Sequence, residues 1–172
     1  MTPPEIAFLQ SPLGGVIVVA LALVAFAVTL LWAWNHPDRI AAMWGGAGTA
    51  LLVTIVTFIA MAAGWWQGSY TEIPLIVLLA INLPFQIAGY TLWLGWYRWL
   101  RGKSRWAWLI YGVIVFLLFI PTVVFVDPIQ MQRGQFSMGS GYTIVWDALL
   151  GQFVMWSPVA GYELARKRLV KE

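Results

Sequence analysis

Five long apolar runs occupy most of this chain of 172 residues, and they decide the solvent in which it folds. The runs cover residues 13–34, 40–66, 74–100, 106–126 and 142–162. A helix needs about 20 residues to cross roughly 30 Å of hydrocarbon, so each run is long enough to span a membrane. The composition agrees, because 61% of the residues are hydrophobic and only 10% are charged.

The spans are expected to be helices. An open strand edge in lipid leaves backbone donors and acceptors unpaired, at several kcal/mol each. Strands of a membrane barrel would alternate polar and apolar residues, and none of the five runs does so. The sequence therefore predicts an all-α polytopic membrane protein, a bundle of five transmembrane helices, with residues 1–172 as one domain.

Prolines indicate where three of these helices begin. Ser11 precedes a proline, which suits a first helical turn because proline has no amide proton to leave without a partner. Pro37 and Pro74 are expected to open the second and third helices in the same way.

The basic residues predict the orientation. If all five runs cross, nine of the ten Lys and Arg residues lie on one side of the membrane, and Arg133 alone lies on the other. By the positive-inside rule, the amino terminus is outside and the carboxyl terminus inside, in a cell or inner membrane. The net charge of +3 then needs no nucleic-acid partner, because the basic residues set the topology and contact the lipid bilayer. The nine residues are Arg39, Arg98, Arg101, Lys103, Arg105, Arg166, Lys167, Arg168 and Lys171.

A stripe of small residues on the second helix predicts close packing. Gly45, Gly46 and Thr49 belong to two neighbouring rows with a spacing of four, and small residues let helix backbones approach in lipid. We expect the first helix to cover this stripe, whereas the alternative is a membrane-protein partner bound through the same three residues. The residues expected to contribute from the first helix are Gly14, Gly15, Ala20 and Ala27.

Polar residues inside the spans indicate where a ligand would bind. Asp147 is the one ionisable residue well inside a run, and such residues usually face the bundle interior. Asn82 and Gln86 share a helix face at a comparable depth in the outer half. Trp146 could cage a ligand, and Gly151 would keep a groove open beside Asp147. The alternative is that Asn82, Gln86 and Asp147 only lock three helices together.

Three prolines inside the runs are expected to bend their helices. Pro84 and Pro121 lie in the outer half, and Pro158 lies nearer the inside. Each proline frees the carbonyl four residues earlier, which for Pro158 is that of Val154. Bent helices leave gaps that a ligand could fill.

Conventional catalysis is not expected. The chain has no cysteine, and its single histidine, His36, lies in a turn, so neither a metal cluster nor a Ser/His/Asp set can form. A glycine-rich phosphate loop with its lysine is also missing. We therefore expect no metal and no cofactor.

From residue 82 to the basic tail, the chain resembles the emopamil-binding protein and sigma-2-receptor group, the EXPERA superfamily. The resemblance lies in Asn82-Leu83-Pro84-Phe85, the basic turn 98–105, Ile110-Tyr111, Ile120-Pro121, Asp127, and the helix from Asp147-Ala148-Leu149-Leu150 through Pro158. It implies a five-helix scaffold and a lipid-type ligand.

The isomerase chemistry of that superfamily is not carried over. Its sterol isomerases move a proton with acids and a histidine on the second and third helices, whereas here those helices offer only Asn82 and Gln86. Asp147 stands where the family would have an amide, and Leu150 where it would have a tryptophan.

Together these patterns predict a membrane protein that holds a hydrophobic, sterol- or isoprenoid-like ligand in its outer half. The predicted pocket consists of Asp147, Asn82, Gln86, Trp146 and Gly151. An accessory subunit of a larger membrane complex is the alternative, and a lipid isomerase centred on Asp147 is the third hypothesis.

Overall fold

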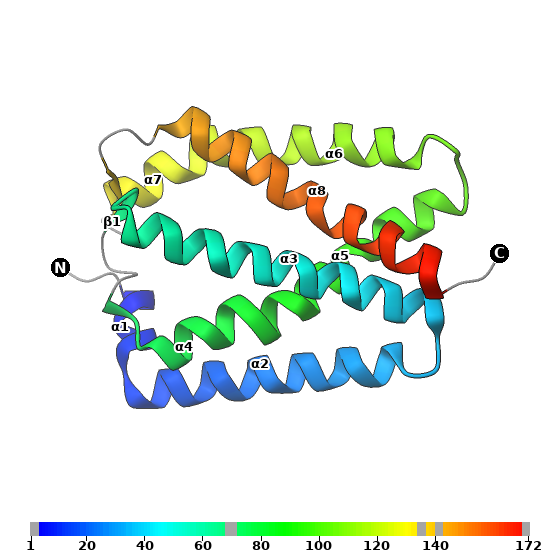
Figure 1. Ribbon diagram of the computed structural model, residues 1–172. Coiled ribbons are helices and arrows are strands. Elements are labelled where there is room, and N and C mark those ends of the chain that lie inside the picture. Colours follow the sequence, from blue (N-terminus) through cyan, green and yellow to red (C-terminus); the bar gives the residue numbers. More distant parts are fainter. Residues whose placement is uncertain (1–3, 68–71, 134–136, 140–142, 170–172) are drawn as a thin grey trace.

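The computed structural model describes residues 4–67, 72–133, 137–139 and 143–169. Long helices run side by side along one direction (Figure 1). The elements in chain order are α1 (Pro4–Gln10), α2 (Pro12–Ala33), α3 (Pro37–Ala62), β1 (Trp66–Gln67), α4 (Leu75–Ala80), η2 (Ile81–Phe85), α5 (Gln86–Arg101), α6 (Ala107–Pro121), η3 (Thr122–Val126), α7 (Asp127–Gln132), β2 (Ser137–Met138) and α8 (Ile144–Leu169).

Four helical segments are long and apolar enough to cross a membrane, by length and composition. They are Pro12–Ala33, Pro37–Ala62, Leu75–Arg101 and Ala107–Gln132. The described residues are almost all helical, and the two-residue strands β1 and β2 pair antiparallel between two connections. The prediction of an all-helical chain with membrane-spanning helices is confirmed in this form.

The predicted helix starts are confirmed. Ser11 caps α2, where its hydroxyl accepts a hydrogen bond from the N–H of Gly14 at 3.0 Å. α3 begins at Pro37, directly after a turn in which Asn35 takes the left-handed conformation with φ 60°. Asparagine tolerates that conformation better than most residues. α4 begins directly after Pro74.

The three internal prolines act in two ways. Pro84 lies inside the π-helical segment η2, and the π-helical η3 follows Pro121, so both predicted interruptions are present. Pro158 instead lies within the continuous helix α8. There the hydroxyl of Ser157 donates to the freed carbonyl of Val154 at 2.7 Å, which compensates for the missing backbone bond.

The small stripe of α3 packs against α5 and α8. A Cβ added at Gly45 would lie 2.5 Å from the carbonyl oxygen of Pro158, and one added at Gly46 would lie 2.6 Å from Oγ1 of Thr91. The hydroxyl of Thr49 lies 2.8 Å from that of a serine on α8. These contacts are too close for any side chain larger than glycine's at either position.

The prediction that the first helix covers this stripe is therefore wrong. Gly45, Gly46 and Thr49 are buried inside the chain itself, against α5 and α8. α2 packs elsewhere, and a Cβ added at Gly15 would lie 3.1 Å from the side chain of Val77 on α4. Helical spacing identifies residues that share a face, but it does not identify the helix that covers them.

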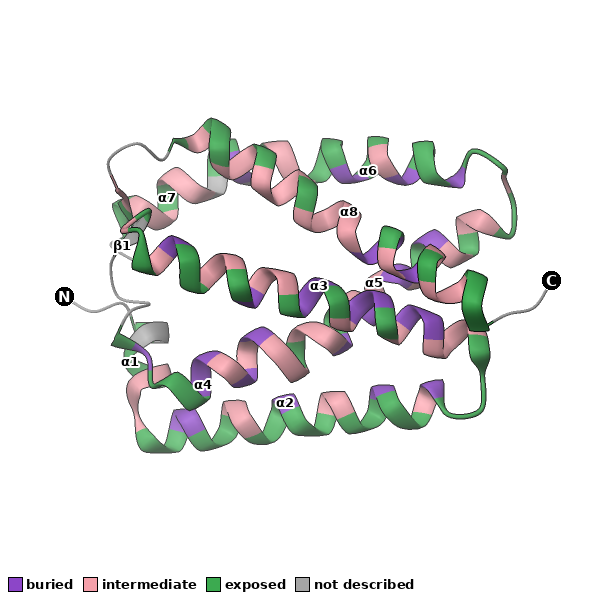
Figure 2. Cartoon of the chain, in the orientation of Figure 1, coloured by how far each residue is buried: buried purple, intermediate pink, exposed green. Residues whose placement is uncertain are grey.

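The outward faces are apolar. Figure 2 shows the outer sides of α2 and α6 as exposed, while buried residues concentrate where α3 passes α5 and α8. Leu13 and Leu31 on α2 are 69% and 74% exposed, and Leu117 on α6 is 62% exposed. Contiguous exposed apolar surface of this kind is typical of contact with a membrane.

An aromatic core holds α5, α6 and α8 together. The ring of Tyr111 on α6 meets that of Tyr97 at 80° and 5.6 Å, and Tyr97 meets Tyr162 at 82° and 5.9 Å. The indole N–H of Trp93 donates to the hydroxyl of Tyr111 at 2.6 Å, which in turn donates to the carbonyl of Met155 at 3.0 Å. This core positions the charged residues described next.

Candidate functional site

The two ends of the helical array differ in charge. We call the basic end the one where the α2–α3 turn, the α5–α6 turn and the last turn of α8 lie together (Figure 1). Among the described residues, it holds eight basic side chains and two acidic ones, Asp38 and Glu163. The basic residues are Arg39, Arg98, Arg101, Lys103, Arg105, Arg166, Lys167 and Arg168.

Asn82 and Gln86, predicted to line a pocket, bond to one another. The amide of Gln86 donates to Oδ1 of Asn82 at 2.9 Å, and the amide of Asn82 donates to the carbonyl of Leu78 at 3.1 Å. The hydroxyl of Thr54 on α3 donates to the backbone carbonyl of Asn82 at 3.0 Å. The Thr54 bond joins η2 to α3, whereas the other two lie within one helix, and Oε1 of Gln86 is buried without a hydrogen-bond partner.

Asp147 lies beside Asp127. Their carboxyl groups hydrogen-bond to each other and thereby join the first turn of α8 to the start of α7. The structure therefore groups Asp147 with a residue that the predicted pocket did not include.

The open groove expected beside Gly151 is filled and Trp146 lies exposed, so a ligand contact of either residue stays a prediction. A Cβ added at Gly151 would lie 1.8 Å from the ring of Phe119, which fills the expected groove from α6. The side chain of Trp146 is 58% exposed on the outer face of α8. The glycine therefore serves helix packing.

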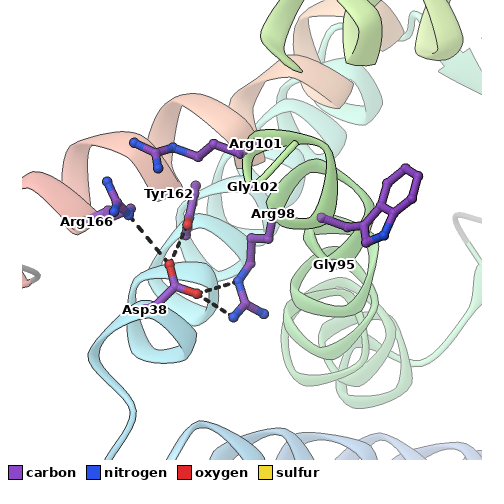
Figure 3. Close-up of a pocket in the computed structure, with 8 residues that line it drawn as sticks. Asp38, Gly95, Arg98, Arg101, Gly102, Tyr162 and Arg166 are labelled. Atoms are coloured by element: carbon purple, nitrogen blue, oxygen red, sulfur yellow. Dashed lines mark hydrogen bonds and ion pairs between the residues drawn. The ribbon is translucent and has the colours of Figure 1, made fainter. Parts of the chain in front are cut away.

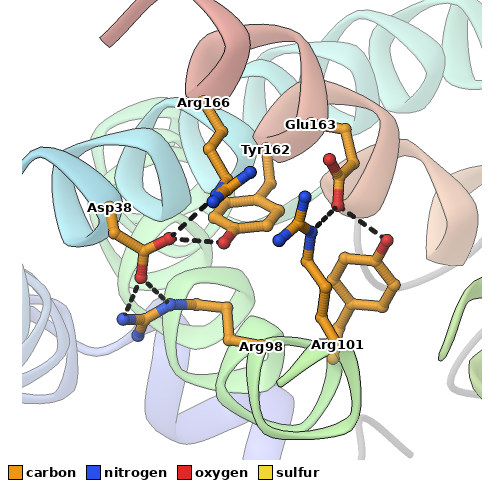
Figure 4. Close-up of polar contacts among 7 residues, drawn as sticks. Asp38, Arg98, Arg101, Tyr162, Glu163 and Arg166 are labelled. Atoms are coloured by element: carbon orange, nitrogen blue, oxygen red, sulfur yellow. Dashed lines mark hydrogen bonds and ion pairs between the residues drawn. The ribbon is translucent and has the colours of Figure 1, made fainter. Parts of the chain in front are cut away.

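A charged network at the basic end centres on Asp38, in the first turn of α3. Nε of Arg98 on α5 donates to Oδ2 of Asp38 at 2.7 Å, and Nη2 of the same arginine contacts the same oxygen. The hydroxyl of Tyr162 donates to Oδ1, and Nε of Arg166 lies 3.7 Å from it (Figure 4). One carboxylate thus joins α3 to both α5 and α8.

A second ion pair lies next to the first. Glu163 on α8 accepts from Nε of Arg101 at 2.8 Å and from the hydroxyl of Tyr97 at 2.8 Å (Figure 4). Tyr97 is 4% exposed, so its hydroxyl links the ion pair to the aromatic core. The end of α5 is therefore held on both sides by acidic residues.

A cavity of about 370 Å³ opens among α3, α5 and α8 at this end (Figure 3). Its lining includes three guanidinium groups, those of Arg98, Arg101 and Arg166, but only one carboxylate, that of Asp38. Trp99 contributes an aromatic wall. A second cavity of the same size lies at the α5–α6 turn and shares Arg101. The first cavity is consequently positive, even with Asp38 ionised.

The arginines of the first cavity are partly shielded and oriented. The side chains of Arg98 and Arg166 are 21% and 16% exposed, so salt screens their charges less than it would on an open surface. The guanidinium of Arg98 also lies 5.3 Å from the ring centre of Trp32, over the indole of α2. A planar, oriented guanidinium suits the oxygens of a phosphate or carboxylate group.

This site was not predicted from the sequence, where the arginines were interpreted only as topology determinants. Asp38 and Glu163 are the signal that was available in the sequence. Each of these two acids lies next to the end of a predicted span and close to basic residues. Their partners are 60 and 62 residues away, so pairing them required the fold. Among the described residues, no three His, Asp or Glu side chains form a group that could hold a metal ion.

Comparison with known proteins identifies no relative. The chain matches no protein-family model, and neither a curated protein nor a solved structure is similar to it. The resemblance to the EXPERA superfamily therefore depends on the quoted residues alone.

Proposed function

We propose that this chain is an integral membrane protein that crosses the bilayer five times and binds the phosphate group of an anionic lipid at its basic end. The binding site is the cavity lined by Arg98, Arg101 and Arg166. The amino terminus is outside and the basic end is cytoplasmic in this proposal.

The proposal makes α8 the fifth span. α8 has 26 residues, a length of roughly 39 Å, and runs beside α3 from the opposite end to the basic end (Figure 1). Residues 148–162, between Asp147 and Glu163, carry no charged side chain. Both acids then lie toward the interfaces, where a charge in a span costs least.

The distribution of charge supports the orientation. Among the described residues, eight basic side chains gather at the basic end, whereas Arg133 lies at the other. Basic residues in short loops next to spans favour the cytoplasmic side. The anionic lipids of that leaflet would then face the arginine-lined cavity.

The single observation that carries the lipid-binding proposal is the set of three arginines around one carboxylate in a cavity of about 370 Å³. Basic pockets between transmembrane helices on the cytoplasmic side bind phosphate head groups. The apolar outer faces of neighbouring helices would hold the acyl chains, so the ligand of this site is amphipathic.

A hydrophobic ligand in the outer half is the second candidate. One observation favours it, because Oε1 of Gln86 and Nε2 of Gln152 are both buried without a hydrogen-bond partner. A polar group of a sterol- or isoprenoid-like molecule could satisfy such atoms. No comparable observation favours a lipid isomerase, and the stripe that an accessory subunit would use is buried.

The test is a fluorescence-anisotropy titration of the detergent-purified protein with short-chain fluorescent phosphatidylglycerol and phosphatidylcholine. We expect phosphatidylglycerol to bind on the order of tenfold more tightly, and Arg98→Gln or Arg166→Gln to remove most of that difference. Inorganic phosphate, titrated as a competitor, distinguishes a lipid head group from free phosphate as the anion that binds. Displacement of the lipid at low millimolar phosphate would indicate a soluble phosphate ligand instead.

Lys167→Gln is the matched control. It removes the same charge at the same end, but Lys167 is exposed and does not line the cavity. Its affinity for phosphatidylglycerol should stay within about twofold of the wild type. Equal losses in all three variants would show diffuse attraction rather than a site, and equal affinity for the two lipids would contradict the proposal.

A further inference from the structure

We infer that the carboxylate of Asp38 occupies the position that the lipid phosphate takes when it binds. The ligand then displaces Asp38 from Arg98 and Arg166. This inference rests on the proposed function. It adds that binding at the cavity releases the start of α3 from α5 and α8.

The contacts of Asp38 resemble those that a bound phosphate group would make. Two nitrogens of Arg98 point to one carboxylate oxygen, while Tyr162 and Arg166 face the other. All four residues line the same cavity (Figure 3). The guanidinium of Arg98 is therefore already bound to Asp38, and an anion that enters the cavity must compete with Asp38 for this guanidinium.

Asp38 is also the partner best able to leave. Its side chain is 39% exposed, whereas those of Arg98 and Arg166 are 21% and 16% exposed. Arg98 is additionally held over the ring of Trp32. The carboxylate can turn toward water at modest cost, while the arginines stay in place for the phosphate.

The exchange has a structural consequence. Asp38 lies in the first turn of α3, directly after the α2–α3 turn. Its contacts with Arg98, Tyr162 and Arg166 tie this turn to α5 and α8. When the phosphate accepts the hydrogen bonds of Arg98 and Tyr162, the beginning of α3 loses these contacts. Lipid binding would thus loosen this turn and tighten the contacts of α5 and α8 around the ligand.

Removing the competing anion should raise affinity. We expect Asp38→Asn to bind fluorescent phosphatidylglycerol roughly tenfold more tightly than the wild type, because the asparagine amide competes poorly for a guanidinium. The gain should shrink to about twofold in the Arg98→Gln background, since Asp38 acts through Arg98. An equal gain in both backgrounds would show only long-range repulsion and would overturn the exchange.

Hydrogen exchange in the wild-type protein gives a second test that needs no variant to fold. With phosphatidylglycerol bound, amides of residues 40–43 should exchange several-fold faster, while phosphatidylcholine should leave them unchanged. Protection of these amides by phosphatidylglycerol would mean that Asp38 stays in place, and would overturn the inference.

The inference and the proposed function can fail separately. If the wild type prefers phosphatidylglycerol and needs Arg98, but Asp38→Asn gains nothing and residues 40–43 become protected, the inference is wrong and the proposed function stands. If the wild type shows no preference for phosphatidylglycerol, the proposed function itself is wrong.

Discussion

Nε of Arg98, near the end of α5, donates to Oδ2 of Asp38, in the first turn of α3, at 2.7 Å. The pair joins segments 60 residues apart and places an acid inside the most basic region of the protein. Tyr162 and Arg166 extend the contact to α8. A structural ion-pair network and an anion-binding cavity therefore share the same residues.

The orientation can be tested on single cysteines, because the chain has none of its own. We expect Gly102→Cys, in the exposed α5–α6 turn, to resist an impermeant thiol reagent added outside intact cells. Gln132→Cys, exposed at the opposite end, should react with it. Both should react once the cells are opened. The reverse pattern in intact cells would invert the topology.

Packing at the α3–α8 crossing predicts a large effect from one methyl group. Gly45→Ala should lower the free energy of unfolding by about 1–3 kcal/mol, because the new Cβ would meet the backbone of α8. Gly48→Ala on the same helix is the control, since a Cβ there has nothing within 4 Å. Its effect should stay within about 0.5 kcal/mol in the same denaturant titration. Similar effects from both would contradict this packing.

The aromatic core depends on one hydroxyl. Tyr111→Phe should lower the free energy of unfolding by about 1–3 kcal/mol, because the half-buried indole N–H of Trp93 loses its acceptor. Adding Trp93→Phe should then cost less than Trp93→Phe costs in the wild type, since the two residues act as a pair. Strict additivity in thermal or denaturant unfolding would show that the hydrogen bond contributes little.

Asp147 should tolerate an amide but not a hydrocarbon. Asp147→Asn can still hydrogen-bond to Asp127, and it removes one of two neighbouring acidic groups, so the melting temperature should be unchanged or higher. Asp147→Leu removes the bond and leaves the carboxyl of Asp127 without this partner, and it should melt earlier. An equal loss in both variants would mean that the negative charge of Asp147 is required.

The starts of several helices were predictable because they follow from local physics. Ser11 and Pro37 mark helix starts, and Pro84 marks the irregular segment η2, each through its own local chemistry. The helix that covers Gly45 was not predictable, because every other span was a possible partner in lipid. Only the fold brings Pro158 of α8 against that glycine.

The candidate site was only partly predictable for the same reason. Asn82 and Gln86 were expected to share a face and do bond to one another, since they are four residues apart on one helix. Asp38 and Arg98 needed long-range pairing that no spacing rule supplies. The groove beside Gly151 was misjudged because an open groove and a tightly filled one look alike in sequence, and the ring of Phe119 decides between them.

Native mass spectrometry of the protein extracted in mild detergent tests the central claim most directly. We predict a retained lipid that yields a phosphate-containing head group on fragmentation, and its loss from the Arg98→Gln/Arg166→Gln variant but not from Lys167→Gln. A wild-type protein that carries no lipid, a neutral hydrophobic molecule, or a phospholipid retained equally by all three proteins would contradict it.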